Sequence, residues 1–177
     1  NICSVNKNQK NIVLNNVDKK IDTAKTSINP QDIVPGLYQN PIANISTAEG
    51  FVVTDSKAEN NEDANKQVVD DHLEIALKNT SGKDLSGFEI YYTITDQTTN
   101  QKEGYYKKLD GFVLKSNETK SIHFDNKTGD GHFTSNTNSI YYKSPNKMVF
   151  DVIISVPNYK IETIKVNKDA GGAEQKD

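Results

Sequence analysis

Tyrosine is the residue type in this chain whose spacing most directly suggests a binding surface. Six of the eight tyrosines occur as adjacent pairs: Tyr91-Tyr92, Tyr105-Tyr106 and Tyr141-Tyr142. Because neighbours in a strand point to opposite faces, each pair is expected to place one ring in the core and one outside. Outward rings on neighbouring strands would form an aromatic patch suited to a sugar face or a protein partner. The residues expected in this patch are Tyr91, Tyr105 and Tyr141. The alternative is that they serve only as strand formers.

The loop that runs from Asp125 to His132 carries the oxygen ligands and glycines that can wrap a calcium ion. Asp125 and Asp130 are its candidate ligands. The spacing does not match an EF-hand, because Lys127 and Gly129 stand where that motif needs Asp or Asn. The sequence therefore leaves two interpretations of this loop, a calcium site or an ordinary surface connection.

The three histidines, His72, His123 and His132, do not have the spacing of a transition-metal site. By strand alternation we expect His123 to face solvent. Nucleophilic catalysis needs Ser or Cys next to a histidine and an orienting acid, and no Gly-x-Ser-x-Gly elbow is present. An enzyme is not expected. One alternative remains, a small metal-dependent hydrolase with its site on residues 126–138 that depends on Asp130 or His132.

Charge and composition exclude several classes of function. The chain has 177 residues, and its 21 basic residues, all lysine, stand against 24 acidic ones, for a net charge of -3. This charge is a poor match for binding nucleic acid by counterion release. Lysine also lacks the planar fork with which arginine clamps phosphate, so phosphate recognition is disfavoured. No run of about 18 apolar residues is present, which argues against a membrane-spanning helix.

Residues 50–168 show the period-two pattern of a β-sheet protein and must position the candidate residues. Leu73, Ile75 and Leu77 alternate with more polar residues, as in a half-buried antiparallel strand. About eight short strands separated by turns about every 8–12 residues predict an all-β, immunoglobulin-like antiparallel sandwich of about seven to eight strands. Further strands are expected at 51–54, 88–95, 105–106, 112–114, 122–124, 140–142, 148–156 and 160–166.

The two ends of the chain have a different composition. Residues 1–49 are polar and contain three prolines, which predicts an extension or tether. Apolar residues spaced by three and four predict a short amphipathic helix within 13–28, with a tether that orders only on docking as the alternative. Residues 169–177, which include two adjacent glycines, are expected to form a flexible tail.

Two stretches carry a resemblance to a known class of modules. Residues 73–88, LEIALKNTSGKDLSGF, and residues 114–122, LKSNETKSI, resemble the core of immunoglobulin-like adhesion modules, of the fibronectin-III-like kind, in bacterial secreted and surface proteins. The resemblance covers roughly residues 50–167 and is at the level of fold. It implies an exported, non-catalytic module and carries over no functional residues.

The single cysteine, Cys3, has a resemblance of its own. It is followed by a polar stretch and resembles the lipid-anchored cysteine of bacterial lipoproteins. Ile2 departs from that pattern, which needs a small residue before the cysteine. An incidental free thiol is therefore the alternative. Because the chain begins at Asn1, we expect that a leader was removed.

A covalent cross-link is a further implication of the resemblance. Some surface immunoglobulin-like modules join a lysine to an asparagine by an isopeptide bond that a buried acid promotes. Asp151, inside the apolar run 148–154, is the candidate acid, because burial would favour its neutral form.

These observations lead to one main expectation and two alternatives. We expect a non-catalytic binding or spacer module, extracellular or attached to the cell surface, of a bacterial surface or secreted protein. The first alternative is a carbohydrate-binding accessory domain that uses the three tyrosines, and the second is the hydrolase described above. The expected partner is a cell-surface protein or a polysaccharide and not nucleic acid. The module is expected to be monomeric and to carry no cofactor other than calcium.

Overall fold

The structure is a computed structural model that describes residues 38–60, 62, 65–67 and 72–171. The expected helix within 13–28, Cys3 and residues 172–177 lie outside the described residues. The elements in chain order are β1 (Phe51–Lys57), β2 (Leu73–Asn79), β3 (Leu85–Ser86), β4 (Glu89–Asp96), β5 (Lys102–Lys108), β6 (Val113–Leu114), β7 (Thr119–Phe124), β8 (His132–Phe133), α2 (Ile140–Lys143), β9 (Met148–Ser155) and β10 (Glu162–Lys168).

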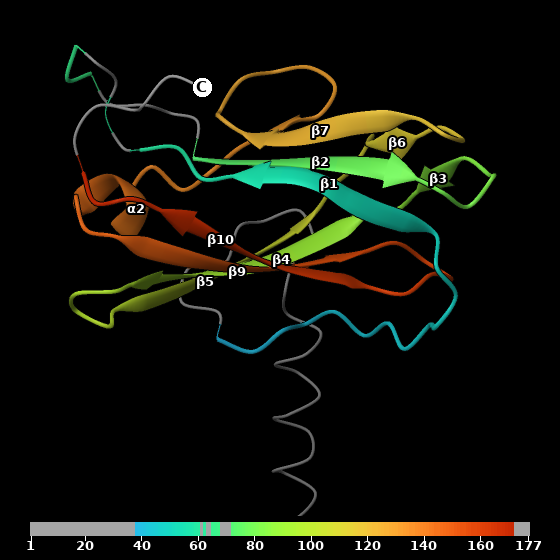
Figure 1. The fold of residues 1–177 in the computed structure, drawn as a ribbon, viewed down its shortest axis with the longest axis horizontal. Coiled ribbons are helices and arrows are strands. Elements are labelled where there is room, and N and C mark those ends of the chain that lie inside the picture. The colour runs from blue at the N-terminus through green and yellow to red at the C-terminus, as the bar shows by residue number, and fades with distance from the viewer. Residues whose placement is uncertain (1–37, 61, 63–64, 68–71, 172–177) are drawn as a thin grey trace, which may run out of the picture. The chain divides into compact units, whose positions relative to one another are not determined.

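The strands form two stacked sheets. One sheet has the order β1-β2-β7-β8 and the other has the order β10-β9-β4-β5, while β3 pairs with β6 in a small third sheet. Figure 1 shows the two larger sheets as layers, one above the other. All pairings are antiparallel except that of β7 with β8, which is parallel.

The order of the long strands is that of an immunoglobulin-like sandwich. When β1, β2, β4, β5, β7, β9 and β10 are lettered A, B, C, C′, E, F and G, the sheets become A-B-E and G-F-C-C′. The predicted all-β fold is therefore confirmed, including the predicted final hairpin, which is β9 and β10.

The core lies between the two sheets and is filled by the alternate residues of each strand. Leu73, Ile75 and Leu77 of β2 are fully buried, as their alternation predicts. Phe88 meets Phe51 edge to face, with ring centroids 5.5 Å apart. Each such buried side chain stabilises the fold by about 1.5–3 kcal/mol relative to an exposed one. The apolar residues whose alternation predicts the strands are therefore the same residues that form the core.

The tyrosine pair at 141–142 does not lie on a strand. Residues 140–143 form the helical turn α2, in which the Ser144 N–H donates to the Ile140 carbonyl at 3.0 Å. The Tyr141 ring is fully buried, and its hydroxyl donates to the Glu59 carbonyl at 3.0 Å. The strand expected here is wrong, because periodicity alone does not distinguish a short apolar strand from a buried helical turn. Figure 1 shows α2 at one end of the sandwich.

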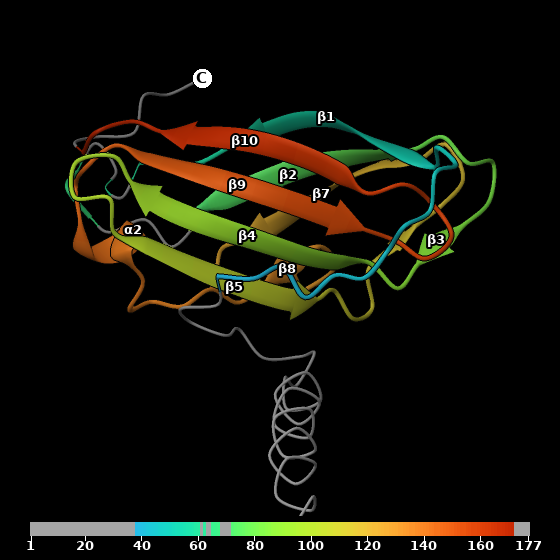
Figure 2. The same ribbon diagram turned by 90° about the horizontal axis from the view of Figure 1, so that it is seen from below.

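The folded domain begins before Gly50. The Asn44 side-chain amide donates to Ser155 Oγ, to the Val156 carbonyl and to the Tyr159 carbonyl at 2.8–3.0 Å. Figures 1 and 2 show that residues 38–50, drawn in blue to cyan, run across the outer face of the β10-β9-β4-β5 sheet. The last part of the predicted tether is therefore docked on the sandwich.

Candidate functional site

The three tyrosines expected to form an exposed patch are buried. Tyr91 is 5% exposed, Tyr105 is 1% exposed and Tyr141 is fully buried. The predicted exposed aromatic patch is therefore wrong, and the carbohydrate-binding alternative loses the three rings on which it relied.

Each tyrosine is buried for a different reason. Tyr91 does lie on the outer face of its strand, opposite Tyr106, but that face is the one crossed by residues 38–50. Tyr105 is paired with Tyr92 and points into the core, where the two ring centroids are 5.4 Å apart. Tyr141 belongs to the helical turn described above. Alternation gave the correct face for Tyr91 but contained no information on what covers it.

The two calcium candidates, Asp125 and Asp130, make separate contacts. Asp125 is 2% exposed, and its carboxylate faces the Lys127 N–H at 3.0 Å and His132 Nδ1 at 2.7 Å. The Asp130 side chain is 63% exposed and pairs with Lys120 Nζ at 3.0 Å. Within the described part of the chain, no three His, Cys, Asp or Glu side chains converge as a ready-made metal cage.

A cross-strand row of polar side chains lies on the outer face of the β1-β2-β7-β8 sheet. Lys57, Glu74, His123 and His132 are successive partners in the register of the four strands. Glu74 Oε2 is 3.7 Å from both Lys57 Nζ and His123 Nδ1. The rings of His123 and His132 are stacked, with centroids 4.9 Å apart and planes 17° apart. We call the two stacked rings the histidine pair.

Asp125 selects which ring nitrogen of His132 faces a carboxylate. Burial raises the pKa of the Asp125 carboxyl, but the hydrogen bonds from the Lys127 N–H and from His132 outweigh burial, and the pKa lies below its usual value. The ionised carboxylate accepts a hydrogen bond, so Nδ1 of His132 carries the proton. In the neutral ring this leaves Nε2 with a lone pair, available as a base or as a metal ligand.

Gly131 makes the histidine pair sterically attainable. It has a φ of 80°, and a Cβ built on it would lie 2.6 Å from the Ser121 carbonyl oxygen. The His123 N–H donates to the Gly131 carbonyl at 2.7 Å. Only glycine allows β8 to approach β7 this closely, so this residue sets the register that places His132 beside His123.

A groove of about 510 Å³ adjoins the histidine pair. It is bounded by residues 110–113 and 115 on one side and by residues 129–133 on the other, with Glu118 and Lys120 also in its wall. Three of its residues, Phe112, Val113 and Phe133, are apolar. The groove therefore has an apolar portion bordered by charged side chains.

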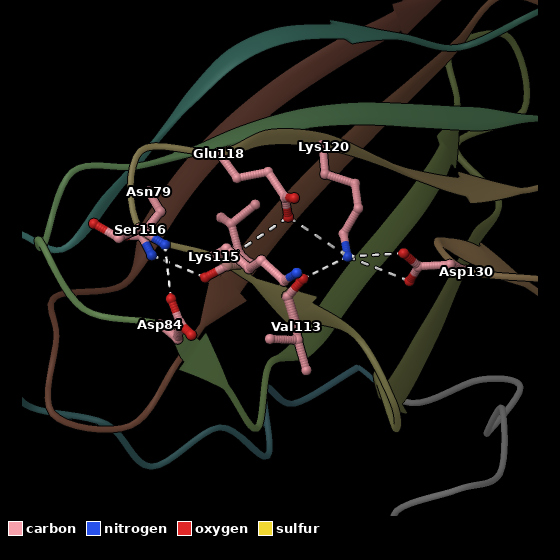
Figure 3. Close-up of polar contacts among 9 residues, drawn as sticks. Asn79, Asp84, Val113, Lys115, Ser116, Glu118, Lys120 and Asp130 are labelled. Carbon is pink, nitrogen blue, oxygen red and sulfur yellow. Dashed lines mark hydrogen bonds and ion pairs between the residues drawn. The ribbon is translucent and has the colours of Figure 1, made fainter.

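Lys120 is the central charged residue of the groove. Its ammonium lies 4.6 Å from the centre of the Phe112 ring and 3.0 Å from Asp130 Oδ2. Figure 3 shows the same ammonium directed toward Glu118 and the Val113 carbonyl, to which it donates a hydrogen bond. Its charge is thus balanced within the wall of the groove.

The loop beside the groove is held by buried amide hydrogen bonds. The fully buried Asn79 donates its side-chain amide to the Lys83 carbonyl at 2.6 Å and to the Leu114 carbonyl at 2.8 Å. The Ser116 N–H donates to Asp84 Oδ1 at 2.9 Å (Figure 3). These bonds connect the turn after β2 to the turn after β6. They therefore hold in place the side of the groove that carries Lys115.

Asp151, the acid expected to promote an isopeptide bond, is not buried. Its side chain is 50% exposed and pairs with Lys165 Nζ at 3.1 Å. Phe150 and Val152, its neighbours in β9, point into the core, so Asp151 lies on the outer face. The prediction of a buried carboxylate at this position is wrong, because alternation holds even within a mostly apolar run.

Asp96, at the end of β4, is buried instead. It accepts hydrogen bonds from the Thr98 and Thr99 N–H groups, from Ser144 Oγ and from the Asn146 side-chain amide at 2.8–3.2 Å. Burial raises the pKa of Asp96, but these donors outweigh it and lower the pKa to about 2. Asp96 is therefore ionised at neutral pH.

Lys168, at the end of β10, completes this cluster. It is fully buried, and its ammonium donates to the carbonyls of Asn146 and Asp169, each at 3.0 Å. Burial lowers the pKa of Lys168, while the charges of Asp169 and Asp96 raise it. An isopeptide bond between Lys168 and Asn146 would need an acid that donates a proton to the Asn146 side-chain carbonyl. Asp96 is ionised and instead accepts from the Asn146 side-chain N–H, so it does not activate that carbonyl. We interpret the cluster as a tie between strand ends.

The third histidine, His72, lies in the core and is separate from the groove. Its Nε2 is 3.2 Å from the Tyr92 hydroxyl. Burial lowers its pKa to about 3, so the ring is neutral. Its ring centroid lies 5.0–6.0 Å from those of five aromatic residues: Tyr92, Phe124, Tyr141, Tyr142 and Phe150.

The sequence contained a partial signal for the histidine pair. His123 was placed on the outward phase of its strand, and it does lie on the outer face, next to Glu74. The pairing of β7 with β8 is not visible in the sequence, because β8 begins at His132, where the sequence predicts the end of a loop. A two-residue parallel strand has too short a pattern to be recognised.

Comparisons with known proteins do not assign the chain to a family. No protein-family model matches the chain, and no curated protein matches it. In the described residues, no helix is long and apolar enough to cross a membrane. Function is therefore inferred from the fold and from the groove and histidine pair.

Proposed function

We propose that this chain is a non-catalytic binding module of an exported or surface-attached bacterial protein, and that it holds a protein partner in the groove between residues 110–115 and 129–133. The observation that carries the proposal is the groove itself, in which apolar residues are bordered by charges of both signs. An immunoglobulin-like sandwich is a rigid support for such a surface.

The chemistry of the groove favours a polypeptide over a sugar. Sugar faces are commonly stacked on exposed aromatic rings, and the three tyrosines of the predicted patch, Tyr91, Tyr105 and Tyr141, are buried. Val113 is exposed, whereas Phe112 lies beneath the Lys120 ammonium. Two lysines, Lys115 and Lys120, and three acids, Asp110, Glu118 and Asp130, line the groove, which suits a partner segment that carries both charges and apolar side chains.

The test compares a groove variant with a matched surface variant. Val113→Asp combined with Lys115→Glu changes the groove, and Lys165→Glu makes a comparable charge change on β10, in the other sheet. Immobilised domain is presented with extracellular-matrix proteins, cell-surface protein fractions and cell-wall polysaccharide, and retention is measured. Circular dichroism confirms that each variant is folded.

The expected result is retention of a protein fraction that is lost in the groove variant and kept by Lys165→Glu. Retention that is equal in all three forms would show that the partner binds elsewhere. If no fraction is retained by any form, the module acts as a spacer and not as a binder.

A further inference from the structure

We propose that His123 and His132 form a binding site for one divalent transition-metal ion, of the zinc, copper or nickel class, through one imidazole nitrogen from each ring. This inference goes beyond the proposed function, since partner binding in the groove does not require a metal. The site is a surface site on the β1-β2-β7-β8 sheet, open to solvent on one side.

The first support is the placement of the two rings. They are direct register partners on adjacent strands, and each side chain is about one quarter exposed, 26% for His123 and 28% for His132. The strands are held in this register by the hydrogen bond from the His123 N–H to the Gly131 carbonyl at 2.7 Å. The backbone therefore presents two imidazoles together before any ligand binds, which lowers the entropy cost of coordination.

The second support is a carboxylate beside each ring. Asp125 Oδ2 accepts the hydrogen bond from His132 Nδ1 at 2.7 Å, and Glu74 Oε2 lies 3.7 Å from His123 Nδ1. Metal-ligating histidines commonly donate their second ring N–H to a carboxylate, which fixes the tautomer and raises the basicity of the coordinating nitrogen. Asp125 is itself held by the Lys127 N–H, so the carboxylate that accepts from His132 Nδ1 is fixed in place.

Coordination requires both rings to rotate from their stacked arrangement. Two Zn–N bonds of about 2.0–2.1 Å in a tetrahedral site hold the nitrogens about 3.3 Å apart. The ring centroids are 4.9 Å apart and the planes nearly parallel, so the rings must tilt toward each other at their coordinating edges. Partly exposed side chains can make such a rotation.

The ligand type selects the metal. Imidazole nitrogen suits zinc, copper and nickel, whereas calcium and magnesium prefer oxygen ligands. The remaining positions would be filled by water, since no third His, Cys, Asp or Glu of the described residues converges with the pair. The site is therefore expected to bind more weakly than a closed four-ligand zinc site.

The experiment is a calorimetric titration of the untagged full chain with Zn²⁺ alone. The test variants are His123→Asn and His132→Asn, each of which removes one ligand. A second pair compares Asp125→Asn, which alters the orienting carboxylate, with Asp130→Asn, which makes the same charge change on an exposed residue paired with Lys120. Circular dichroism confirms that each variant keeps the fold.

We expect one Zn²⁺ per chain, with affinity at least tenfold weaker in each histidine variant. Asp125→Asn should weaken binding by about 10–100-fold, while Asp130→Asn should leave it unchanged. Shifts of the imidazole resonances of His123 and His132, but not of the buried His72, would locate the ion at the pair. An absence of Zn²⁺ binding in the natural chain, or histidine variants that bind Zn²⁺ as tightly as the natural chain, would overturn the proposal.

Discussion

At the scale of single residues, the same residue type has different roles according to what surrounds it. His72 is enclosed by aromatic rings and is held neutral, whereas His123 and His132 lie on a sheet surface beside carboxylates. Tyr91 and Tyr105 likewise occupy opposite faces of their sheet, yet both are buried. Residue type is thus a weak guide to role here, and the local environment decides it.

The depressed pKa of His72 makes the stability of the fold depend on pH. The unfolded ring binds a proton below about pH 6.5, and the folded ring does so only below about pH 3. Between these values the unfolded state holds one more proton, so stability falls as the pH falls, by about 1.4 kcal/mol for each pH unit.

This pH dependence is measurable by urea unfolding. From about pH 7 to about pH 5, the natural chain should lose about 2 kcal/mol more stability than His72→Gln, which cannot take up the proton. The difference between the two proteins removes the contribution of the other titrating groups. Parallel losses in both proteins would show that His72 is not held neutral in the folded state.

At the scale of elements, the strand ends are tied together by buried polar groups. Asp96 at the end of β4, Asn146 before β9 and Lys168 at the end of β10 form one hydrogen-bonded cluster. A buried polar group that loses its partner costs more free energy than the pair contributes when intact. The cluster is therefore where a single substitution should do most damage to this end of the sandwich.

Asp96→Ala removes the acceptor for four hydrogen-bond donors. We expect a loss of about 3 kcal/mol in the free energy of unfolding, because several partly buried N–H and O–H groups lose their acceptor and the Lys168 ammonium loses the compensating charge of Asp96. The control is Asp151→Ala, which removes an exposed carboxylate paired with Lys165 and should cost less than about 1 kcal/mol. Urea unfolding compares them, and equal losses would contradict this account of the cluster.

At the scale of the whole molecule, a segment that precedes the first strand completes one face of the sandwich. Residues 38–50 cross the outer face of the β10-β9-β4-β5 sheet (Figure 2), and Asn44 bonds to groups 111–115 residues further along the chain. The Lys160 N–H also donates to the Ala48 carbonyl at 2.8 Å. These long-range contacts turn part of a polar extension into part of the domain.

Asn44→Ala should loosen this segment without unfolding the sandwich. Loss of the three hydrogen bonds that its side chain donates to the sandwich, and of the one that it accepts from the Ser46 N–H, is expected to cost about 1–3 kcal/mol, and the Lys160 amide should exchange its hydrogen faster. Asn40→Ala is the matched control, because Asn40 is exposed and bonds only to the nearby Ile42 N–H among the contacts described. Unchanged Lys160 exchange in Asn44→Ala would show that Asn44 does not hold the segment.

The fold class and the core were determined by the sequence itself. Alternation is a local property, so Leu73, Ile75 and Leu77 could be placed inside from the pattern alone. The same rule could have placed Asp151 outside, but its apolar neighbours obscured the phase. The immunoglobulin-like sandwich was also anticipated, from the number of strands and the turn spacing.

The candidate site was decided only by the tertiary structure. The burial of Tyr91 accompanies the passage of a distant segment over its face, and the meeting of His123 with His132 depends on a two-residue parallel strand. The buried cluster around Asp96 joins residues 48–72 positions apart. Periodicity tells which face of a strand a residue occupies. Which segment lies against that face depends on chain packing over long separations, which no local pattern records.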